Sequence, residues 1–335
     1  MERPFLKMNG LGNDFIVVDA RREAFDPDPD RIRRLASRSA GIGCDQFVVI
    51  GPASDADASV RFWNPDGGEA GACGNATRCV AWRLMEESGA DTVRLSTAGG
   101  ALRAWRRGAL RVAVDMGRPR LHWRAVPLAG PDDTLSVHVP EAAGLGPATC
   151  LSMGNPHAVL FVPDAGAVDA ARIGPAVEAS PLFPERVNVG FAEVRSRTRV
   201  RLRVWERAAG LTRACGSGAC AALVAGVRRG LLDSAARLEL DGGELEIAWG
   251  ERAPGRALSA FPRTRSTSGM AAKVPGSIWA AQPVTMSRAP GFSRRALRMA
   301  WRAWRTASPV TAQVLKTTAS VTPSSAARAR ITSLS

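Results

Sequence analysis

The sequence predicts an α/β (α+β) protein built from two pseudo-symmetric lobes, each with short strands wrapped around a central helix. Two observations predict this fold. A stretch that begins Ala-Cys-Gly and runs into an apolar helical segment occurs twice, at residues 72–82 and 214–223. The strand patterns around it also recur in a similar order. We therefore expect one helix that begins at a Cys, and one thiol, in each lobe.

The first lobe is expected to cover residues 1–118. A segment capped by Asp predicts a helix at 30–39, and the central helix is expected to follow Cys73 and end near Gly89. Short apolar runs between Gly, Pro, Asn and Asp residues predict the strands. These strands are expected at 15–18, 47–50, 60–63, 92–95, 101–105 and 110–114.

The second lobe is expected to cover residues 119–252 and to repeat this plan. A helix is predicted at 168–179, and the second central helix is expected to follow Cys215 and end near Gly230. Its strands are predicted by the same kind of apolar run. They are expected at 148–152, 158–162, 186–191, 199–206, 238–240 and 245–249.

Residues 253–335 form a basic tail rich in Ser, Arg and Pro. The net charge of +14 comes entirely from the end of the chain, because residues 252–335 hold 14 Lys and Arg and no acidic residue. Low periodicity and this composition predict a mostly disordered tail. Residues 294–305 have the spacing of a basic amphipathic helix, which could bind an anionic membrane or nucleic acid. Chance segregation in an Arg- and Trp-rich stretch explains the same pattern.

Composition excludes several classes of protein. The sequence has no apolar run of the roughly 18 residues that a membrane span needs, and its first residues do not resemble a signal peptide. We therefore expect a cytoplasmic protein with reduced thiols. Six Cys without a CxxC pair, together with three His, predict neither a metal site nor a disulfide framework.

Cys73 and Cys215 are the strongest candidates for chemistry. Small residues after each Cys leave backbone N–H groups open, and a helix start places its positive dipole end beside the sulfur. Both effects are expected to favour the thiolate and to lower the thiol pKa from about 8.5. The alternative is that both are small buried residues, which is the usual fate of a free Cys. That role is expected for the remaining residues, Cys44, Cys79, Cys150 and Cys220.

Several motifs in order resemble the diaminopimelate epimerase family across residues 4–250. They are Met-Asn-Gly-Leu-Gly-Asn-Asp-Phe at 8–15, the two Cys stretches, Met-Gly-Asn-Pro-His at 153–157, and Glu206-Arg207. The resemblance implies a substrate cleft between the lobes and no cofactor. It also implies interconversion of LL- and meso-2,6-diaminopimelate by one thiolate and one thiol, in lysine and peptidoglycan precursor biosynthesis. A homodimer is implied as well.

The resemblance also assigns site residues one at a time. Cys73 and Cys215 match the two acid–base residues, and His157 and Glu206 match polar residues beside the reacting centre. The remaining matches are contacts to the substrate diaminopimelate. They are Asn13, Gln46, Asn64, Gly74, Asn75, Asn155, Asn188, Glu206, Arg207, Gly216 and Ser217.

Two departures from the family pattern stand out. Ala208 occupies a position where the family usually has Gly, so the turn would be strained if it needs a positive φ. In addition, no Met-Thr-Gly-Pro-like closing strand follows Trp249. Loss of that strand would leave the first lobe with an unpaired edge. The basic tail would then be either a genuine addition or an out-of-frame product.

Other functions remain open at this point. A related two-Cys amino-acid racemase would share the same logic, although the Asn-rich stretches and Arg207 favour a long zwitterionic substrate. A thiol oxidoreductase would normally carry a nearby resolving Cys. A frame-shifted C-terminus would give a poorly active product. The tail alone suggests a nucleic-acid or membrane-surface protein.

Overall fold

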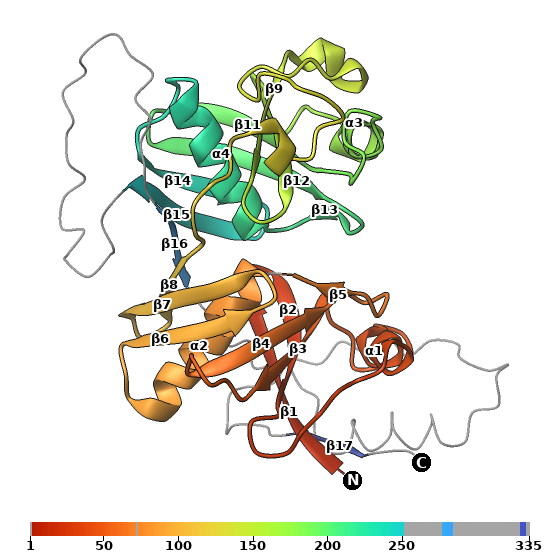
Figure 1. The fold of residues 1–335 in the computed structure, drawn as a ribbon, viewed down its shortest axis with the longest axis vertical. Coiled ribbons are helices and arrows are strands. Elements are labelled where there is room, and N and C mark those ends of the chain that lie inside the picture. The colour runs from red at the N-terminus through yellow and green to blue at the C-terminus, as the bar shows by residue number, and fades with distance from the viewer. Residues whose placement is uncertain (1, 72, 251–276, 284–328, 333–335) are drawn as a thin grey trace, which may run out of the picture.

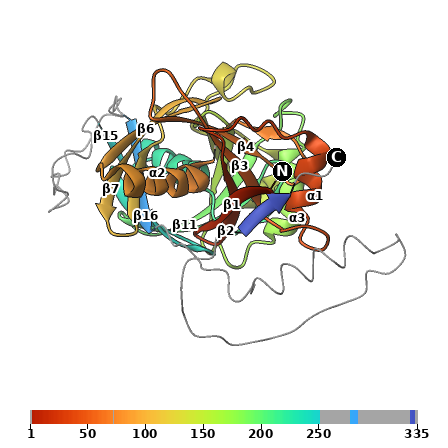
Figure 2. The ribbon, with the colours of Figure 1, turned by 90° about the horizontal axis from the view of Figure 1, so that it is seen from below.

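The computed structural model describes residues 2–71, 73–250, 277–283 and 329–332, which form two lobes stacked end to end (Figure 1). Each lobe curls a sheet around one long helix, α2 in the first lobe and α4 in the second. Seen from below, α2 lies among the strands of its own lobe (Figure 2). The two-lobed α/β class predicted from the sequence is confirmed.

The first lobe is a curled mixed sheet with one helix inside the curl and a short helix outside it. Its elements are β1 (Glu2–Gly10), β2 (Asn13–Asp19), α1 (Pro29–Ala36), β3 (Gln46–Gly51), β4 (Ala58–Trp63), β5 (Glu69–Ala70), α2 (Gly74–Ser88), β6 (Thr92–Thr97), β7 (Gly100–Gly108) and β8 (Arg111–Asp115).

The second lobe follows two short 3₁₀ helices, η1 (Trp123–Ala125) and η2 (Pro140–Leu145). Its further elements are β9 (Ala148–Ser152), β10 (Pro156–Phe161), α3 (Ala170–Glu178), β11 (Asn188–Ser196), β12 (Arg199–Glu206), β13 (Gly210–Thr212), α4 (Gly216–Arg228), β14 (Ala235–Leu240) and β15 (Gly243–Gly250). Each strand and helix expected within residues 1–250 overlaps an observed one.

Strand pairing shows that the second lobe repeats the first. The series β1–β2 antiparallel, β2–β3 parallel, β3–β4 antiparallel, β4–β6 parallel and β6–β7 antiparallel has a counterpart in β9–β10, β10–β11, β11–β12, β12–β14 and β14–β15. The helices α1 and α3 occupy equivalent places, as do α2 and α4. In the first lobe β7 also pairs antiparallel with β8. If the repeat continues, β15, the counterpart of β7, needs a partner strand equivalent to β8.

That partner is β16 (Ser277–Pro283), so the prediction that the closing strand is missing was wrong. β16 pairs antiparallel with β15 and, on its other side, antiparallel with β8. It therefore runs between the lobes and joins their sheets into one (Figure 1). The edge of β8 that the sequence left unpaired is covered. Two open edges that present free N–H and C=O groups would favour such a strand.

A second strand from the tail, β17 (Ala329–Thr332), pairs antiparallel with the start of β1 (Figure 2). The predicted tail therefore contains at least two strands. The predicted amphipathic segment at 294–305 and the other residues of this tail lie outside the described residues.

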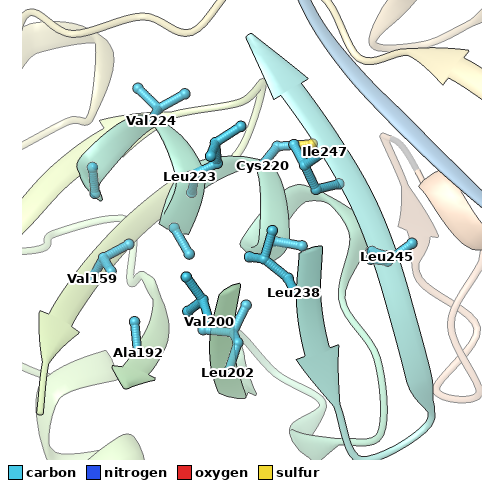
Figure 3. Packing of buried hydrophobic residues seen from close by; sticks show 14 of the residues in the cluster. Val159, Ala192, Val200, Leu202, Cys220, Leu223, Val224, Leu238, Leu245 and Ile247 are labelled. Carbon is cyan, nitrogen blue, oxygen red and sulfur yellow. The ribbon is translucent and has the colours of Figure 1, made fainter. Parts of the chain in front are cut away.

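The two central helices are buried because sheet surrounds them. Ten residues of α4 are buried, and its Leu223 and Val224 pack against the inner face of the second lobe. Figure 3 shows this cluster, with side chains from β10, β11, β12, β14 and β15 around the helix. A helix that is apolar on nearly every side is stable only in such a setting. The packing of α4 on all sides holds the helix in one place, and this in turn sets the position of Cys215 at its N-terminus.

The first lobe holds α2 in the same way. Val80 and Met85 of α2 pack with Phe15, Phe62 and Val112 of the surrounding strands. The helix ends at Gly89, which has φ 72° and so accepts the left-handed conformation without a Cβ clash. Among the helices described in residues 2–250, none is both long and apolar enough to span a membrane.

The role of β16 predicts a large effect of proline on stability. In Ala280→Pro/Ala281→Pro, two consecutive residues of a central strand lose their N–H groups, which point to opposite neighbours. We expect the free energy of unfolding to fall by about 2–6 kcal/mol, measured by urea denaturation. The control Ala280→Ser/Ala281→Ser keeps both N–H groups. An unfolding curve for the proline variant equal to that of the control would contradict the pairing.

Candidate active site

Each candidate thiol caps the helix that follows it. Cys73 is the N-cap of α2, and its sulfur accepts a hydrogen bond from the N–H of Ala76 at 3.4 Å. Cys215 is the N-cap of α4, and its sulfur accepts one from the N–H of Gly218 at 3.3 Å. Both bonds reach the third residue of the helix, so the two lobes hold their sulfurs alike.

The first turns of α2 and α4 meet at the boundary between the lobes. A Cβ added at Gly216 would lie 3.7 Å from Cα of Gly74. The side chain of Met116 packs close to Gly74 and contacts the hydrophobic clusters of both lobes. The positive ends of two helices thus converge on one place.

Contacts across the boundary hold the second thiol against the first lobe. The carbonyl oxygen of Ala214, the residue before Cys215, accepts hydrogen bonds from Nδ2 of Asn13 at 3.3 Å and of Asn75 at 3.1 Å. Leu11, from the first lobe, packs into the hydrophobic cluster of the second. Asn13 and Asn75, both expected to contact substrate, therefore also join the lobes.

A chain of hydrogen bonds leads from a buried histidine to Cys215. Nε2 of His157 lies 3.0 Å from Oδ1 of Asn155, whose Nδ2 donates to Oγ of Ser217 at 3.3 Å; that oxygen lies 3.5 Å from the sulfur of Cys215. Burial, together with the charge of Arg207, lowers the pKa of His157 to about 3, so the ring is neutral. Because Oδ1 of Asn155 only accepts, Nε2 donates. The Ser217 hydroxyl is then free to donate to the sulfur.

Glu206 lies close to both thiols. Its carboxyl accepts a hydrogen bond from Oγ1 of Thr212 at 2.5 Å, and its charge acts on both Cys73 and Cys215. Burial raises the pKa of Glu206 above its usual range. A carboxyl of raised pKa beside a thiol is able to exchange a proton with it.

Burial dominates the ionisation of the two thiols. It raises the pKa of Cys73 to about 11, against the opposing hydrogen bond from Ala76, and it raises the pKa of Cys215 well above the ordinary value. The prediction that the helix starts would lower both pKa values was therefore wrong for this enclosed arrangement. One N–H bond per sulfur does not replace the lost water.

The other predicted polar residues fall into two small groups. Nε2 of Gln46 donates to Oδ1 of Asn64 at 3.1 Å, and Oε1 of Gln46 is buried without a hydrogen-bond partner among the described residues. Asn188 donates to the carbonyl of Pro156 at 2.8 Å and accepts from the N–H of Arg207 at 3.0 Å. The side chain of Arg207 is exposed.

The polar groups of the site are two thiols, side-chain amides, hydroxyl groups, one imidazole and one carboxyl group. Across the described part of the chain, no three His, Cys, Asp or Glu side chains are grouped so that they could hold a metal ion.

Comparison with known proteins places this arrangement in a family. The model of the diaminopimelate epimerase family matches residues 5–122 and 149–257. A diaminopimelate epimerase of Phenylobacterium zucineum is 57% identical over 265 residues, which is 78% of this chain and 95% of the relative. The chain belongs to the diaminopimelate epimerase family.

Further relatives of this family agree. A diaminopimelate epimerase of Caulobacter vibrioides is 51% identical and covers 80% of this chain and 97% of its own. Among solved structures, a PhzF-family phenazine biosynthesis protein of Bacillus anthracis matches with a TM-score of 0.58 at 12% identity, over 85% of this chain and 97% of its own. A probable proline racemase of Agrobacterium radiobacter matches with a TM-score of 0.56 at 17% identity, over 88% and 95%. These two structures show a shared fold.

Ala208 departs from the glycine expected for a diaminopimelate epimerase, and its backbone has the strained, positive φ considered in the sequence analysis. Its φ is 60°, in the left-handed region. The turn is held by Glu178, a buried carboxylate that accepts from the N–H of Ala208 at 3.0 Å and from Nε1 of Trp205 at 2.6 Å. These bonds fix the turn that carries Glu206 and Arg207.

Sequence reasoning did not single out Ala214, Thr212, Glu178 or Arg78. Ala214 acts through its backbone carbonyl and Glu178 through partners 27 and 30 residues away along the chain, which leaves no local signal. Thr212 is one of many Thr residues, and only the folded turn brings it to Glu206. Arg78 did leave one, because it is a charged residue one turn into a helix that continues with the apolar run Cys79-Val80-Ala81.

The strain at Ala208 predicts that Ala208→Gly stabilises the protein. Relief of the positive φ outweighs the added freedom of the unfolded chain, so the free energy of unfolding should rise by about 1 kcal/mol. The control is Ala209→Gly in the same exposed turn, where φ is not positive. That change should lower stability by about 0.4–1 kcal/mol. Urea denaturation measures both, and destabilisation by Ala208→Gly would refute the strain.

Proposed function

We propose that this chain is the isomerase that interconverts LL- and meso-2,6-diaminopimelate in lysine biosynthesis, with Cys73 and Cys215 as its two bases. The observation that carries the proposal is the matched pair of thiols. Each caps one of two helices whose first turns meet, and Glu206 lies near both sulfurs.

The reaction needs two acid–base groups on opposite faces of one carbon. One cysteine, as thiolate, removes the α-proton and becomes a thiol. The other, as thiol, delivers its proton to the opposite face and becomes a thiolate. The product differs from the substrate in configuration alone, and the two cysteines have exchanged roles. The same pair therefore serves both directions of the reaction.

The charge that develops on the substrate is met by the two helix starts. In α2 the N–H of Ala76 binds the thiol and that of Thr77 binds the carbonyl of Cys73. The N–H groups of Gly74 and Asn75 have no acceptor within the helix. Gly216 and Ser217 hold the equivalent places in α4. These four N–H groups are positioned to bind the α-carboxylate and to stabilise the carbanion.

Glu206 and the Ser217 relay adjust the second thiol. Because burial disfavours the thiolate of Cys215, formation of that thiolate needs an acceptor for its proton and donors for its charge. The carboxyl of Glu206 is such an acceptor. Ser217, oriented by Asn155 and His157, and the N–H of Gly218 are such donors.

The second amino-acid group of the substrate requires its own contacts. The unpaired Oε1 of Gln46 suits an ammonium donor, and the neighbouring Asn64 offers a further amide. Arg207 has the planar fork that binds a carboxylate with two hydrogen bonds. These groups, with Asn188, favour a substrate with charged groups at both ends over a small amino acid.

The family is also the ground for inferring the oligomeric state of the protein and the cellular compartment in which it works. We infer a homodimer that works in the cytoplasm. The absence of the closing strand was one ground for expecting a poorly active frame-shifted product, and β16 supplies that strand.

Removal of either thiol should abolish epimerisation. We expect Cys73→Ala and Cys215→Ala each to lower kcat by at least about 1000-fold while the far-UV circular dichroism spectrum stays that of the wild type. The assay follows conversion of LL- to meso-diaminopimelate by chiral chromatography.

The matched controls are Cys79→Ala and Cys220→Ala. Both residues are fully buried on the same two helices, so these changes should cost stability and retain turnover. Wild-type turnover in either variant that lacks a capping thiol would rule out the two-base assignment.

A further inference from the structure

Arg78 is a completely buried arginine placed between the two helix starts. It lies in α2, one turn beyond Gly74, and its relative exposure is 0%. A Cβ added at Gly216 would lie 3.5 Å from Nη2 of Arg78, and one added at Gly74 would lie 3.7 Å from Nη1. The guanidinium is therefore in van der Waals reach of the first turn of each helix.

The guanidinium has few partners. Nη2 donates to Oδ1 of Asn75, whereas Nε and Nη1 are buried without a hydrogen-bond partner among the described residues. Within that part of the chain no carboxylate pairs with it, and buried guanidinium groups are normally paired. A buried donor without an acceptor is costly, so a retained one calls for an explanation.

The ionisable groups around Arg78 are thiols. The groups whose charge acts on it are Cys79 of its own helix, Cys220 of α4 and Cys73 at the N-cap of α2. Glu206 acts on Cys73 from β12, and Asp115 acts on Cys220 from β8. Cys79 and Cys220 are fully buried core residues. Of the three thiols, Cys73 is therefore the one that the proposed reaction converts to a thiolate.

Burial lowers the pKa of Arg78 to about 10, so the group remains positively charged near neutral pH. Its charge adds to the positive ends of α2 and α4, in a region with little water. Such a concentration of positive charge is unfavourable until an anion forms or binds there.

We propose that Arg78 is a positioning residue that favours the thiolate of Cys73 in the proposed epimerisation. This inference rests on the proposed function. Asn75 holds the guanidinium through Oδ1 and holds the carbonyl of Ala214 through Nδ2, so one side chain links the charge to the other lobe. The arginine is thus fixed beside the helix starts and does not need to touch the substrate.

The test is the pH dependence of Cys73 alkylation by iodoacetamide, followed by mass spectrometry of the peptide that contains it. In Arg78→Met the charge is lost, and we expect the midpoint of alkylation to rise by about 1 pH unit, which is a tenfold slower reaction below the midpoint. In Arg78→Lys the charge remains, so the midpoint should stay within about 0.3 unit of the wild type.

Arg83→Met is the matched control, because it removes a charge from a partly exposed position farther along α2. It should leave the midpoint unchanged. If Arg78→Met fails to fold, Arg78→Gln supplies a neutral side chain that keeps a donor for Asn75. A folded neutral variant with the wild-type midpoint would overturn the proposal, since a structural role alone predicts lost stability and no shift.

Alkylation requires no diaminopimelate, so this result is independent of the activity. A shifted midpoint in a chain whose wild type does not epimerise diaminopimelate would support the role of Arg78 and contradict the proposed substrate. An unshifted midpoint in an active enzyme would do the reverse.

Discussion

The convergence of two helix starts at the boundary between the lobes is the constraint on which the structure depends. Gly74 and Gly216 allow α2 and α4 to approach until their first turns touch. Two positive helix ends and the buried Arg78 then share one small region. This concentration of positive charge is unfavourable when nothing balances it, and it stabilises negative charge. A thiolate, a carboxylate and a carbanion each provide such a charge.

The rest of the fold holds the first turns of α2 and α4 together despite this unfavourable electrostatic energy. Each central helix is enclosed by its own curled sheet and packs its buried side chains against the inner face of that sheet. β16 joins the two sheets through hydrogen bonds on both sides. Leu11 packs into the opposite lobe, and Asn13 and Asn75 both bind the carbonyl of Ala214. Backbone pairing, apolar packing and amide hydrogen bonds thus fix the position of the second thiol independently.

Sequence reasoning was sufficient for what repeats locally and insufficient for what depends on long-range contact. The two Cys stretches predicted both central helices, and the positive φ at Ala208 was anticipated from the family's glycine. β16 was missed because it follows a long segment of altered composition, and its role is visible only in strand pairing. The raised pKa of Cys73 was missed because burial is a property of the folded chain. The role proposed for Arg78 was missed because it depends on the closeness of its guanidinium to Gly216, which is 138 residues away along the chain.

The most direct test of the two-base arrangement is the fate of hydrogen at the reacting carbon in deuterated water. LL-diaminopimelate of natural isotopic content is converted by the wild-type chain, and both isomers are analysed by mass spectrometry before the first tenth of the reaction is complete. With Cys73 and Cys215 on opposite faces, the meso product should carry deuterium, and the remaining LL substrate should carry almost none. A product that retains the substrate's own α-hydrogen would show that one group serves both faces, and would contradict this account.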